Sequence, residues 1–235
     1  MPPKVFGPAH LIYVGIYLVV SIIALILIKK FCKTPRAKNT AIFYTALSLL
    51  AVIIWNRIEI AKVDGTWLEL IPDTFCGMSS LLMAVCTLGF KDRNNPVFHC
   101  LIYLAIVGPV ATLIYPAFIG EGPTIFYPET FSSLLHHSIM LFLAVLLLMT
   151  DEFVPDIKRW FCLPLGVCAY VAFGLFEIQV FNFPDAMQIE TPLIAGTPTV
   201  WYTVLGIAVV VQMIIIGVYA LLERTKTEGA AKSLR

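Results

Sequence analysis

Two adjacent histidines, His136 and His137, are the residues whose type and position most strongly suggest chemistry. They lie within an apolar run, Glu129 to Thr150, that is long enough to cross a bilayer as one helix. An ionisable side chain surrounded by hydrocarbon loses its water and needs a partner, so it is a candidate functional residue. Neighbours on a helix point about 100° apart, so we expect only one of the two to face a small site. The other is expected to be structural, bonded to a helix carbonyl.

Cys76 and Thr74 form a second candidate group at the start of another apolar run. A thiol or hydroxyl beside an imidazole supports nucleophilic catalysis, because the base removes the proton and the anion attacks a carbonyl. In a membrane cavity the natural carbonyl is the acyl ester of a lipid. We therefore predict Cys76, or Thr74, as nucleophile and either histidine as base. The simpler alternative is that Cys76 is an ordinary small core residue.

Charged side chains near the ends of the apolar runs are candidates for orienting the base or binding a lipid headgroup. Each also has a simpler interpretation, because the helix dipole favours an acid in a first turn and long side chains extend from a membrane toward water. Glu177 is the hardest to explain in this way, because an acid so close to apolar sequence needs a partner such as Arg57 or a histidine. The candidates are Arg57, Glu59, Asp73, Glu177 and His10.

Other chemistries fit the sequence less well. A metal site made of the two adjacent histidines, His10 and Glu177 lacks the i, i+4 spacing that places two ligands on one helical face. We expect no metal and no cofactor. A retinal protein needs a lysine in its last helix, and none lies between Thr199 and Leu222. A proton-coupled transporter needs polar groups toward the inner side as well, and they are sparse there. The competing hypothesis to an enzyme is a non-enzymatic transporter or binder of a small or lipidic solute.

The composition is typical of a membrane protein. Hydrophobic residues make up 59% of the chain and the mean hydropathy is +0.88, whereas soluble domains contain about 45–50% apolar residues. The net charge of +1 gives no indication of a nucleic-acid partner. The six cysteines show no CxxC spacing, which argues against a disulfide framework and a structural zinc site. Membrane lipids are the expected partners, and the sequence predicts no oligomeric state.

Seven apolar runs are long enough to span a bilayer, since about 20 residues rising ~1.5 Å each cross a core of ~30 Å. We predict an all-α, polytopic membrane protein with one transmembrane domain over residues 1–235, a bundle of seven helices. The first run has full membrane length and no cleavage site follows it, so we expect no signal peptide. The predicted helices are about 10–28, 40–60, 72–90, 97–117, 130–150, 160–181 and 199–222.

The basic residues predict the orientation of this bundle, because Lys and Arg favour short loops on the cytoplasmic side. The first, third and fifth turns and the C-terminal tail hold 13 of the 16 basic residues, against Lys4, Arg57 and Lys62 on the other side. The N-terminus is therefore expected outside and the C-terminus in the cytoplasm. The candidate residues then gather at the outer ends of the helices, and the inner halves are almost purely apolar. This pattern predicts a polar cavity that opens toward the outer face or outer leaflet.

Four segments spread over nearly the whole chain resemble one protein family. They are FGPAH (Phe6–His10), LELIPDTFC (Leu68–Cys76), SSLLHHSIMLFLAVLLL (Ser132–Leu148) and TPTVWYTVLGI (Thr197–Ile207). The chain resembles the YwaF-like integral membrane proteins, a mostly bacterial group related to a human membrane acyltransferase of ether phospholipids. More remotely, it is similar to the androgen-induced hydrolases of branched fatty-acid esters. The resemblance implies a multi-pass protein of a bacterial plasma membrane that hydrolyses or transfers lipid acyl groups.

The chain departs from this family at the third predicted helix. The family pattern there resembles L-P-x-H-x-C, and this chain reads IPDTFC (Ile71–Cys76). The proline and cysteine match, whereas Thr74 occupies the place of the family's histidine. The resemblance therefore implies Cys76 with the histidines at 136 and 137 as the catalytic pair. Because the related hydrolases are thought to use a threonine with a histidine, Thr74 stays a candidate nucleophile.

Overall fold

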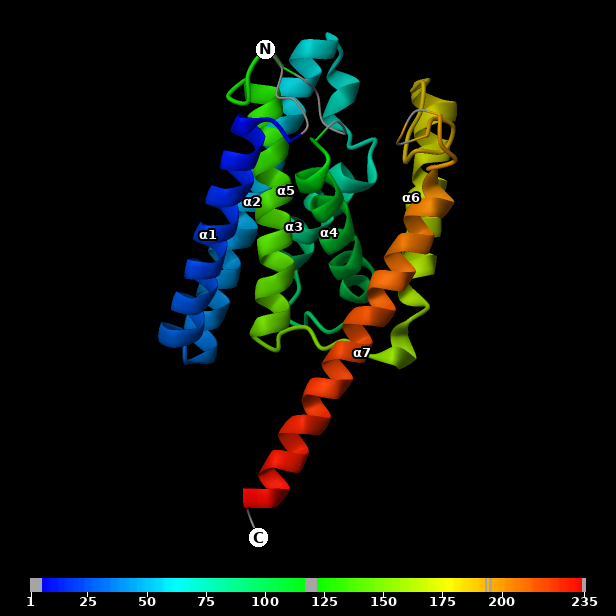
Figure 1. Ribbon diagram of the computed structural model, residues 1–235. Coiled ribbons are helices and arrows are strands. Elements are labelled where there is room, and N and C mark those ends of the chain that lie inside the picture. Colours follow the sequence, from blue (N-terminus) through cyan, green and yellow to red (C-terminus); the bar gives the residue numbers. More distant parts are fainter. Residues whose placement is uncertain (1–5, 117–121, 193, 195, 234–235) are drawn as a thin grey trace.

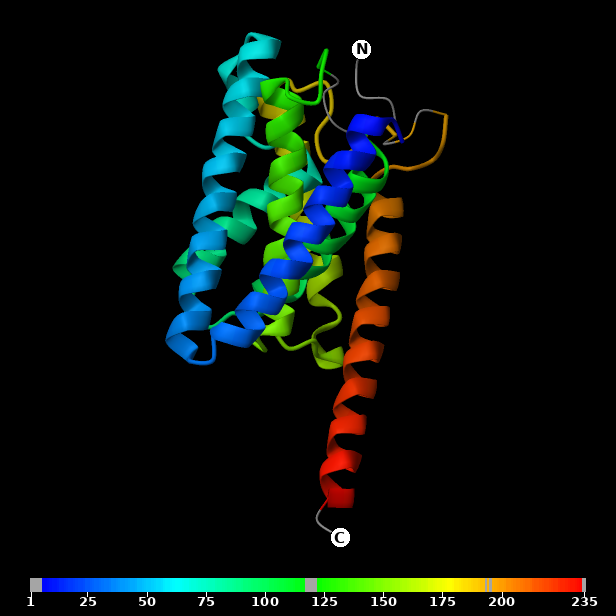
Figure 2. The ribbon, with the colours of Figure 1, turned by 60° about the vertical axis from the view of Figure 1, so that its left-hand side comes forward.

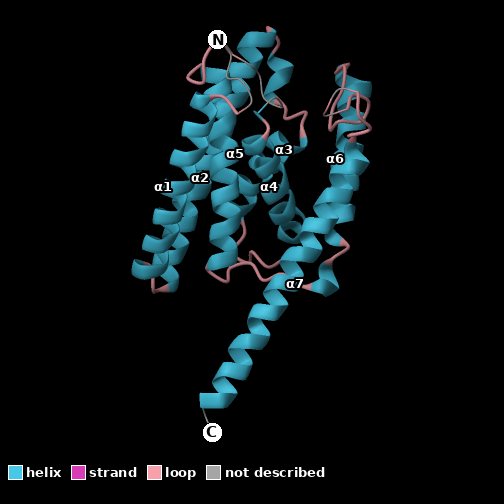
Figure 3. Ribbon diagram, in the orientation of Figure 1, coloured by secondary structure: helices cyan, strands magenta, loops and turns pink. Residues whose placement is uncertain are grey.

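The structure is a computed structural model. The part of the chain that it describes contains seven α-helices and two short 3-10 segments, joined by loops. That part is residues 6–116, 122–192, 194 and 196–233, with side chains through Glu223, and it contains no strand (Figure 3). The α-helices are α1 Pro8–Phe31, α2 Pro35–Asp64, α3 Phe75–Gly89, α4 Pro96–Ile114, α5 Pro128–Met149, α6 Cys162–Phe181 and α7 Trp201–Ser233. The 3-10 segments are η1 Trp67–Leu70 and η3 Ile157–Arg159.

Six of these helical segments are long and apolar enough to cross a membrane. They are α1, α2, α4, α5, the segment Ile157–Phe181 that includes α6, and Trp201–Glu223 of α7. The all-helical fold is thus consistent with a polytopic membrane protein.

α3 is shorter than the sequence predicted. It has 15 residues instead of the expected range 72–90 and rises only about 22 Å at ~1.5 Å per residue. It begins late because Thr74 caps it, with the hydroxyl accepting a hydrogen bond from the Gly77 N–H at 3.1 Å. This helix is therefore too short to cross a ~30 Å hydrocarbon core by itself.

The start of α1 and the end of α7 lie at opposite ends of the bundle (Figure 1). We call the end where α1 begins the upper end, and the other the lower end. α7 extends below the other helices (Figure 2), because it continues to Ser233 rather than ending near Leu222 as predicted. The last eleven residues of α7 include Glu, Lys and Ala, which are strong helix formers.

α4 and α5 form the centre of the bundle. α5 packs against α2 and α4, and α3, α6 and α7 also pack against α4. Residues from several helices meet in one apolar core, including Phe98, Tyr103, Met140 and Leu143, each 0% exposed. The elements that carry the predicted site residues are therefore positioned mainly by their packing on α4 and α5.

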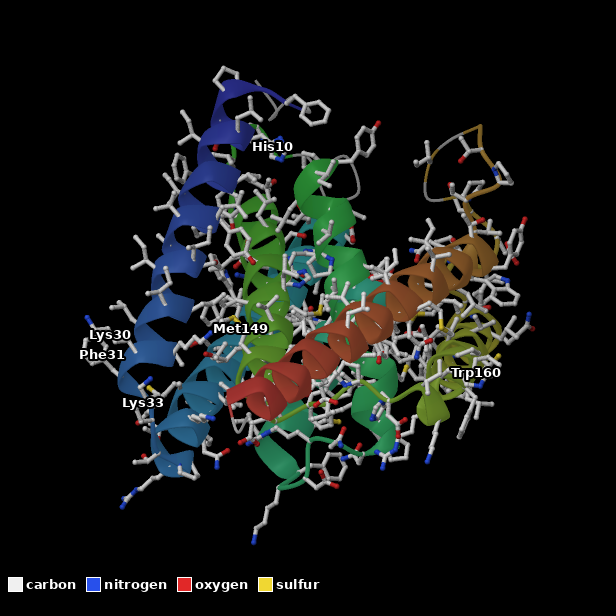
Figure 4. All side chains as sticks on the ribbon, turned by 60° about the horizontal axis from the view of Figure 1, so that its bottom comes forward. His10, Lys30, Phe31, Lys33, Met149 and Trp160 are labelled. Carbon is white, nitrogen blue, oxygen red and sulfur yellow. The ribbon has the colours of Figure 1, made fainter. Side chains whose placement is uncertain are left out.

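α1 is the least packed helix, and none of its most apolar stretch is buried. Two side-chain hydrogen bonds hold its upper part. His10 Nε2 lies 2.8 Å from the Leu113 carbonyl, and the Tyr13 hydroxyl lies 2.9 Å from Ser138 Oγ. Figure 4 shows His10 directed toward the bundle and Lys30, at the lower end of the same helix, directed away from it.

A second polar network lies at the lower end. The guanidinium of Arg93 donates to Glu152 at 3.0 Å and to Asn39 at 2.7 Å, which joins the turn before α4 to the turn after α5 and to the start of α2. His99 and Gln212, both 0% exposed, are buried in the helix halves nearer this end. The prediction that these halves are almost purely apolar is therefore wrong in part. Single polar residues in separate apolar runs carried no pattern, and only the packing of α4 and α7 brings them into the interior.

Candidate functional site

A cavity of about 620 Å³ lies in the upper half of the bundle, between α2, α3, α4, α5 and α7. Polar groups come mainly from α2, the start of α3 and α5, and apolar groups come from α4 and α7. Six of the nine predicted site residues line this cavity. They are Cys76, Thr74, His136, His137, Asp73 and Arg57.

Cys76 lies in the first turn of α3, two residues after the capping residue Thr74. Its thiol packs against the backbone of α4, because a Cβ built on Gly108 would lie only 2.7 Å from Cys76 Sγ. The side chain of Thr112, one turn further along α4, interacts with the same thiol. The sulfur is thus fixed between the start of one helix and the glycine of another.

The two histidines converge on the cavity, contrary to the expectation that only one would face it. Their ring centroids are 4.1 Å apart and the rings are tilted by 34°. The imidazoles are 3% and 4% exposed. Adjacent Cα–Cβ vectors do diverge on a helix, but each side chain has two rotatable bonds, and the rings turn toward one another beyond the Cβ atoms.

A hydrogen bond decides which ring nitrogen of His137 can act as a base, but not which nitrogen of His136. His137 Nδ1 lies 2.7 Å from the Ser133 carbonyl, and a carbonyl only accepts, so Nδ1 carries the proton and Nε2 keeps its lone pair. This is the bond to a helix carbonyl that was expected for one of the two rings. His136 Nδ1 lies 2.9 Å from Ser80 Oγ, which also lies 3.2 Å from Met140 Sδ. A hydroxyl can donate or accept, so this contact leaves the His136 tautomer open.

Arg57 is the centre of a charged group at the upper end of the cavity. Its guanidinium lies 2.9 Å from Asp73 and 3.5 Å from Glu69, and its side chain is 7% exposed. Burial raises the pKa of Asp73, with the nearby Arg57 acting in the opposite direction. Burial, and then the charge of Asp73, also raise the pKa of Glu69. Asp64 and Glu129 line the cavity as well, so carboxylates outnumber the one arginine.

Three predicted site residues lie away from the cavity lining. Glu59 accepts hydrogen bonds from Lys62 at 2.9 Å and Trp55 at 3.2 Å on α2. His10 contacts the end of α4 through the Leu113 carbonyl. Glu177 on α6 is 0% exposed, and neither carboxylate oxygen has a hydrogen-bond partner among the residues described. The expected partner for Glu177, Arg57 or a histidine, is therefore not bonded to it.

The cavity also contains residues that sequence reasoning missed. Asn56 donates to Ser132 Oγ at 3.1 Å and links α2 to α5. Gln188 lines the upper part, where its carbonyl accepts from the Trp201 N–H at 3.0 Å. A lone Asn inside the second apolar run, and the Gly-Pro pair at Gly108, were the available sequence signals. Gln188 lies in a loop whose sequence carries no such signal.

A second hollow of about 770 Å³ lies between α1, α2 and α5. Its lining is almost entirely apolar and includes none of the nine predicted site residues. The chemistry suggested by the sequence therefore belongs to the cavity on the other side of α5. Within the described residues, no three His, Cys, Asp or Glu side chains are grouped so that they could hold a metal ion.

The geometry of the cavity suits an amphiphilic ligand, because a thiol and two imidazoles lie between a charged end and an apolar wall. Comparison with known proteins gives a family. Neither the curated proteins nor the solved structures contain a match to this chain. The sequence model of the TMEM164 family matches residues 5–222, which is most of the chain. The chain therefore belongs to the TMEM164 family, a family of membrane proteins.

Proposed function

We propose that this protein hydrolyses or transfers lipid acyl esters in the cavity, with Cys76 as nucleophile and a histidine of α5 as base. The observation that carries the proposal is that a thiol and two imidazoles, 60 positions apart in the sequence, line one cavity. A nucleophile and a base that share a partly enclosed, largely apolar site form the usual arrangement for covalent acyl transfer.

His137 is the better candidate for the base. Its Nδ1–H is held by the Ser133 carbonyl, so its Nε2 is the lone-pair nitrogen. In other acyl-transfer sites, too, an acceptor that binds the Nδ1–H of the catalytic histidine fixes the tautomer and the orientation of its ring. His136, held by Ser80, then forms the wall beside the base and helps to keep its ring in place.

The proposed reaction has two steps. His137 Nε2 takes the thiol proton of Cys76 as the sulfur attacks the ester carbonyl, because a free thiolate would be costly in this buried position. The tetrahedral intermediate collapses, the C–O bond breaks, and the imidazolium returns the proton to the departing lysolipid alkoxide. In the second step the same base takes a proton from water, or from an acceptor hydroxyl, as its oxygen attacks the thioester. The C–S bond breaks, the acid or the new ester is released, and the imidazolium returns the proton to the Cys76 sulfur.

Arg57 is proposed to bind the phosphate of the lipid headgroup. It is the one cation among the described residues that line the cavity, and a hydrogen bond from a guanidinium to a phosphate oxygen is strengthened by the opposite charges. Asp73 holds its Nη1, and its Nε has no partner among the described residues. A headgroup phosphate at this end would place the ester linkages deeper, toward the thiol.

Intact-mass measurement of the purified protein tests this proposal. The protein in lipid nanodiscs is incubated with a phospholipid that carries a reactive acyl ester, and Cys76→Ala, His137→Gln and Cys168→Ala are measured in parallel. Cys168 is a matched control because it is an exposed cysteine on α6 outside the cavity lining. We expect an acyl adduct on the wild type and on Cys168→Ala, and none on the other two variants.

Two results would change the proposal. An adduct that survives Cys76→Ala would move the nucleophile to Thr74, whose hydroxyl oxygen accepts from the Gly77 N–H. The absence of any adduct, together with exchange of solute in liposomes, would favour the non-enzymatic transporter or binder. The relationship to the YwaF-like proteins and to the ether-phospholipid acyltransferase is part of this same proposal.

We further propose that the upper end faces the outside of a bacterial plasma membrane, with the C-terminus in the cytoplasm. The distribution of basic residues supports this orientation. Labelling with a membrane-impermeant maleimide tests it in intact cells, with one new cysteine in a background that carries Cys32→Ser, Cys76→Ala and Cys168→Ala. Glu190→Cys in the loop before α7 should react, and Asp92→Cys in the turn before α4 should not.

A further inference from the structure

We infer that the cavity opens sideways into the bilayer between α4 and α7, and that this opening admits and holds one acyl chain of a lipid. The inference rests on the proposed function for its choice of ligand. It adds the path by which a membrane lipid reaches the thiol and the part of the cavity that binds its tail.

The cavity has two chemically different walls. The wall from α2 and α5 carries Arg57 and the two histidines, whereas the wall from α4 and α7 is apolar. The apolar wall consists of Val107 and Val110 of α4 with Val204, Ile207 and Val211 of α7. Such a division matches an amphiphile, because each part of the ligand meets surface of its own polarity.

Two residues of the apolar wall also lie on the outer surface of the protein. Val110 is 38% exposed and Ile207 is 52% exposed, although both line the cavity. α4 and α7 pack against one another, and α7 lies at the edge of the bundle (Figure 2). Both belong to segments long and apolar enough to span a membrane. The surface between them therefore faces hydrocarbon, and the apolar side of the cavity is continuous with the lipid phase.

The reactive thiol lies where the two walls meet. Cys76 Sγ packs on Gly108, the residue directly between Val107 and the Pro109 inside α4. Pro109 has no N–H to donate to the Ala105 carbonyl, so it interrupts the hydrogen bonding of α4 at this level. A chain that lies along Val110 and Ile207 would thus bring its ester end toward the sulfur.

A lipid acyl chain is the occupant that these observations favour. The opening lies between two spanning helices, so the ligand must enter from the membrane interior, where acyl chains are the main component. A helix of a second protein would be too wide to pass into a cavity of about 620 Å³. A charged solute would have to cross the apolar wall without a partner.

Photocrosslinking tests the inference. The protein is placed in nanodiscs that contain phosphatidylcholine with a diazirine near the end of one acyl chain, and crosslinked peptides are mapped by mass spectrometry. We expect the cavity-facing residues of α4 and α7, around Val110 and Ile207, to be labelled most. Ile207→Trp should reduce this labelling, and the rate of adduct formation by a long-chain ester, at least about tenfold, because the added volume fills the opening.

Ile214→Trp is the matched control. Ile214 lies two turns further along α7, is 59% exposed and does not line the cavity, so its replacement should leave both readouts unchanged. Reaction of Cys76 with a small water-soluble maleimide should be the same in wild type and Ile207→Trp, which shows that the variant keeps an intact site.

The inference and the proposed function fail in different ways. The lateral opening would be refuted if the labelling is spread evenly over the lipid-facing residues and if Ile207→Trp leaves the formation of the long-chain adduct unaffected. This holds even if Cys76 becomes acylated. Labelling confined to the α4–α7 wall without an acyl adduct would support the acyl-chain site and refute the enzyme.

Discussion

Replacement of Gly108 by alanine should disturb the thiol of Cys76 more than it disturbs the fold. A Cβ at this position would lie 2.7 Å from Cys76 Sγ, whereas ordinary non-bonded contacts lie near 3.5–4.0 Å. The sulfur must therefore move by about 1 Å. A displacement of that size at a reacting atom can reduce a rate about 100-fold.

The effect of Gly108→Ala on stability should be much smaller. Overpacking costs about 1–3 kcal/mol, and alanine within a helix recovers about 0.5–1 kcal/mol relative to glycine. We expect a net loss of about 1–2 kcal/mol. The assay is the rate at which the acyl adduct forms, together with the thermal midpoint in the same detergent.

Gly206→Ala is the control for this prediction. Gly206 is a helical glycine of α7 where an added Cβ would meet nothing within 4 Å. Its rate of adduct formation should equal that of the wild type. If Gly108→Ala keeps the full rate, or if Gly206→Ala loses as much, then the packing of Cys76 on α4 does not position the sulfur for reaction.

Three further predictions concern the charged groups. Arg57→Ala leaves Asp73 and Glu69 without their shared cation, so it should cost about 3 kcal/mol; an unchanged thermal midpoint would contradict this. Glu177→Gln should be tolerated within about 1 kcal/mol, since neither carboxylate oxygen has a partner among the described residues and the amide avoids burying a charge; a large loss of stability would reveal a partner. Burial raises the pKa of Asp73 above its value in the unfolded chain, so the folded state binds the proton more readily than the unfolded state does. The contribution of Asp73 to stability should therefore rise as the pH falls through that raised pKa. Asp73→Asn should therefore flatten the pH dependence of the thermal midpoint, and a profile as steep as that of the wild type would refute this origin.

The apolar runs predicted most of the helices because about 20 apolar residues have few alternatives to a membrane-spanning helix. The ends of the helices were harder to predict. Thr74 was considered as a nucleophile, whereas its hydroxyl caps α3 and delays the start of that helix. The lower end of α7 was expected to be a tail, because its charged residues cannot lie in hydrocarbon, yet a helix can continue beyond a membrane.

The candidate site could be predicted in part. The predicted membrane orientation, together with the position of each residue along its helix, placed Cys76 and the two histidines at one end of the bundle. The cavity at that end is lined by all three. The convergence of both imidazoles depends on side-chain rotamers, which spacing along a helix does not give. The role of Gly108 depends on how closely α3 approaches α4. That Glu177 has no hydrogen-bond partner among the described residues depends on the orientation of α6.

Mapping the acylated residue tests the central claim most directly. The protein in nanodiscs is incubated with an ester-containing phospholipid, trapped and digested, and each cysteine peptide is examined for an acyl group that hydroxylamine removes. The account predicts the acyl group on Cys76, as a thioester, and its absence when His137 is replaced by Gln. An acyl group found only on the exposed Cys168, or one on Cys76 that persists in His137→Gln at the full rate, would contradict it.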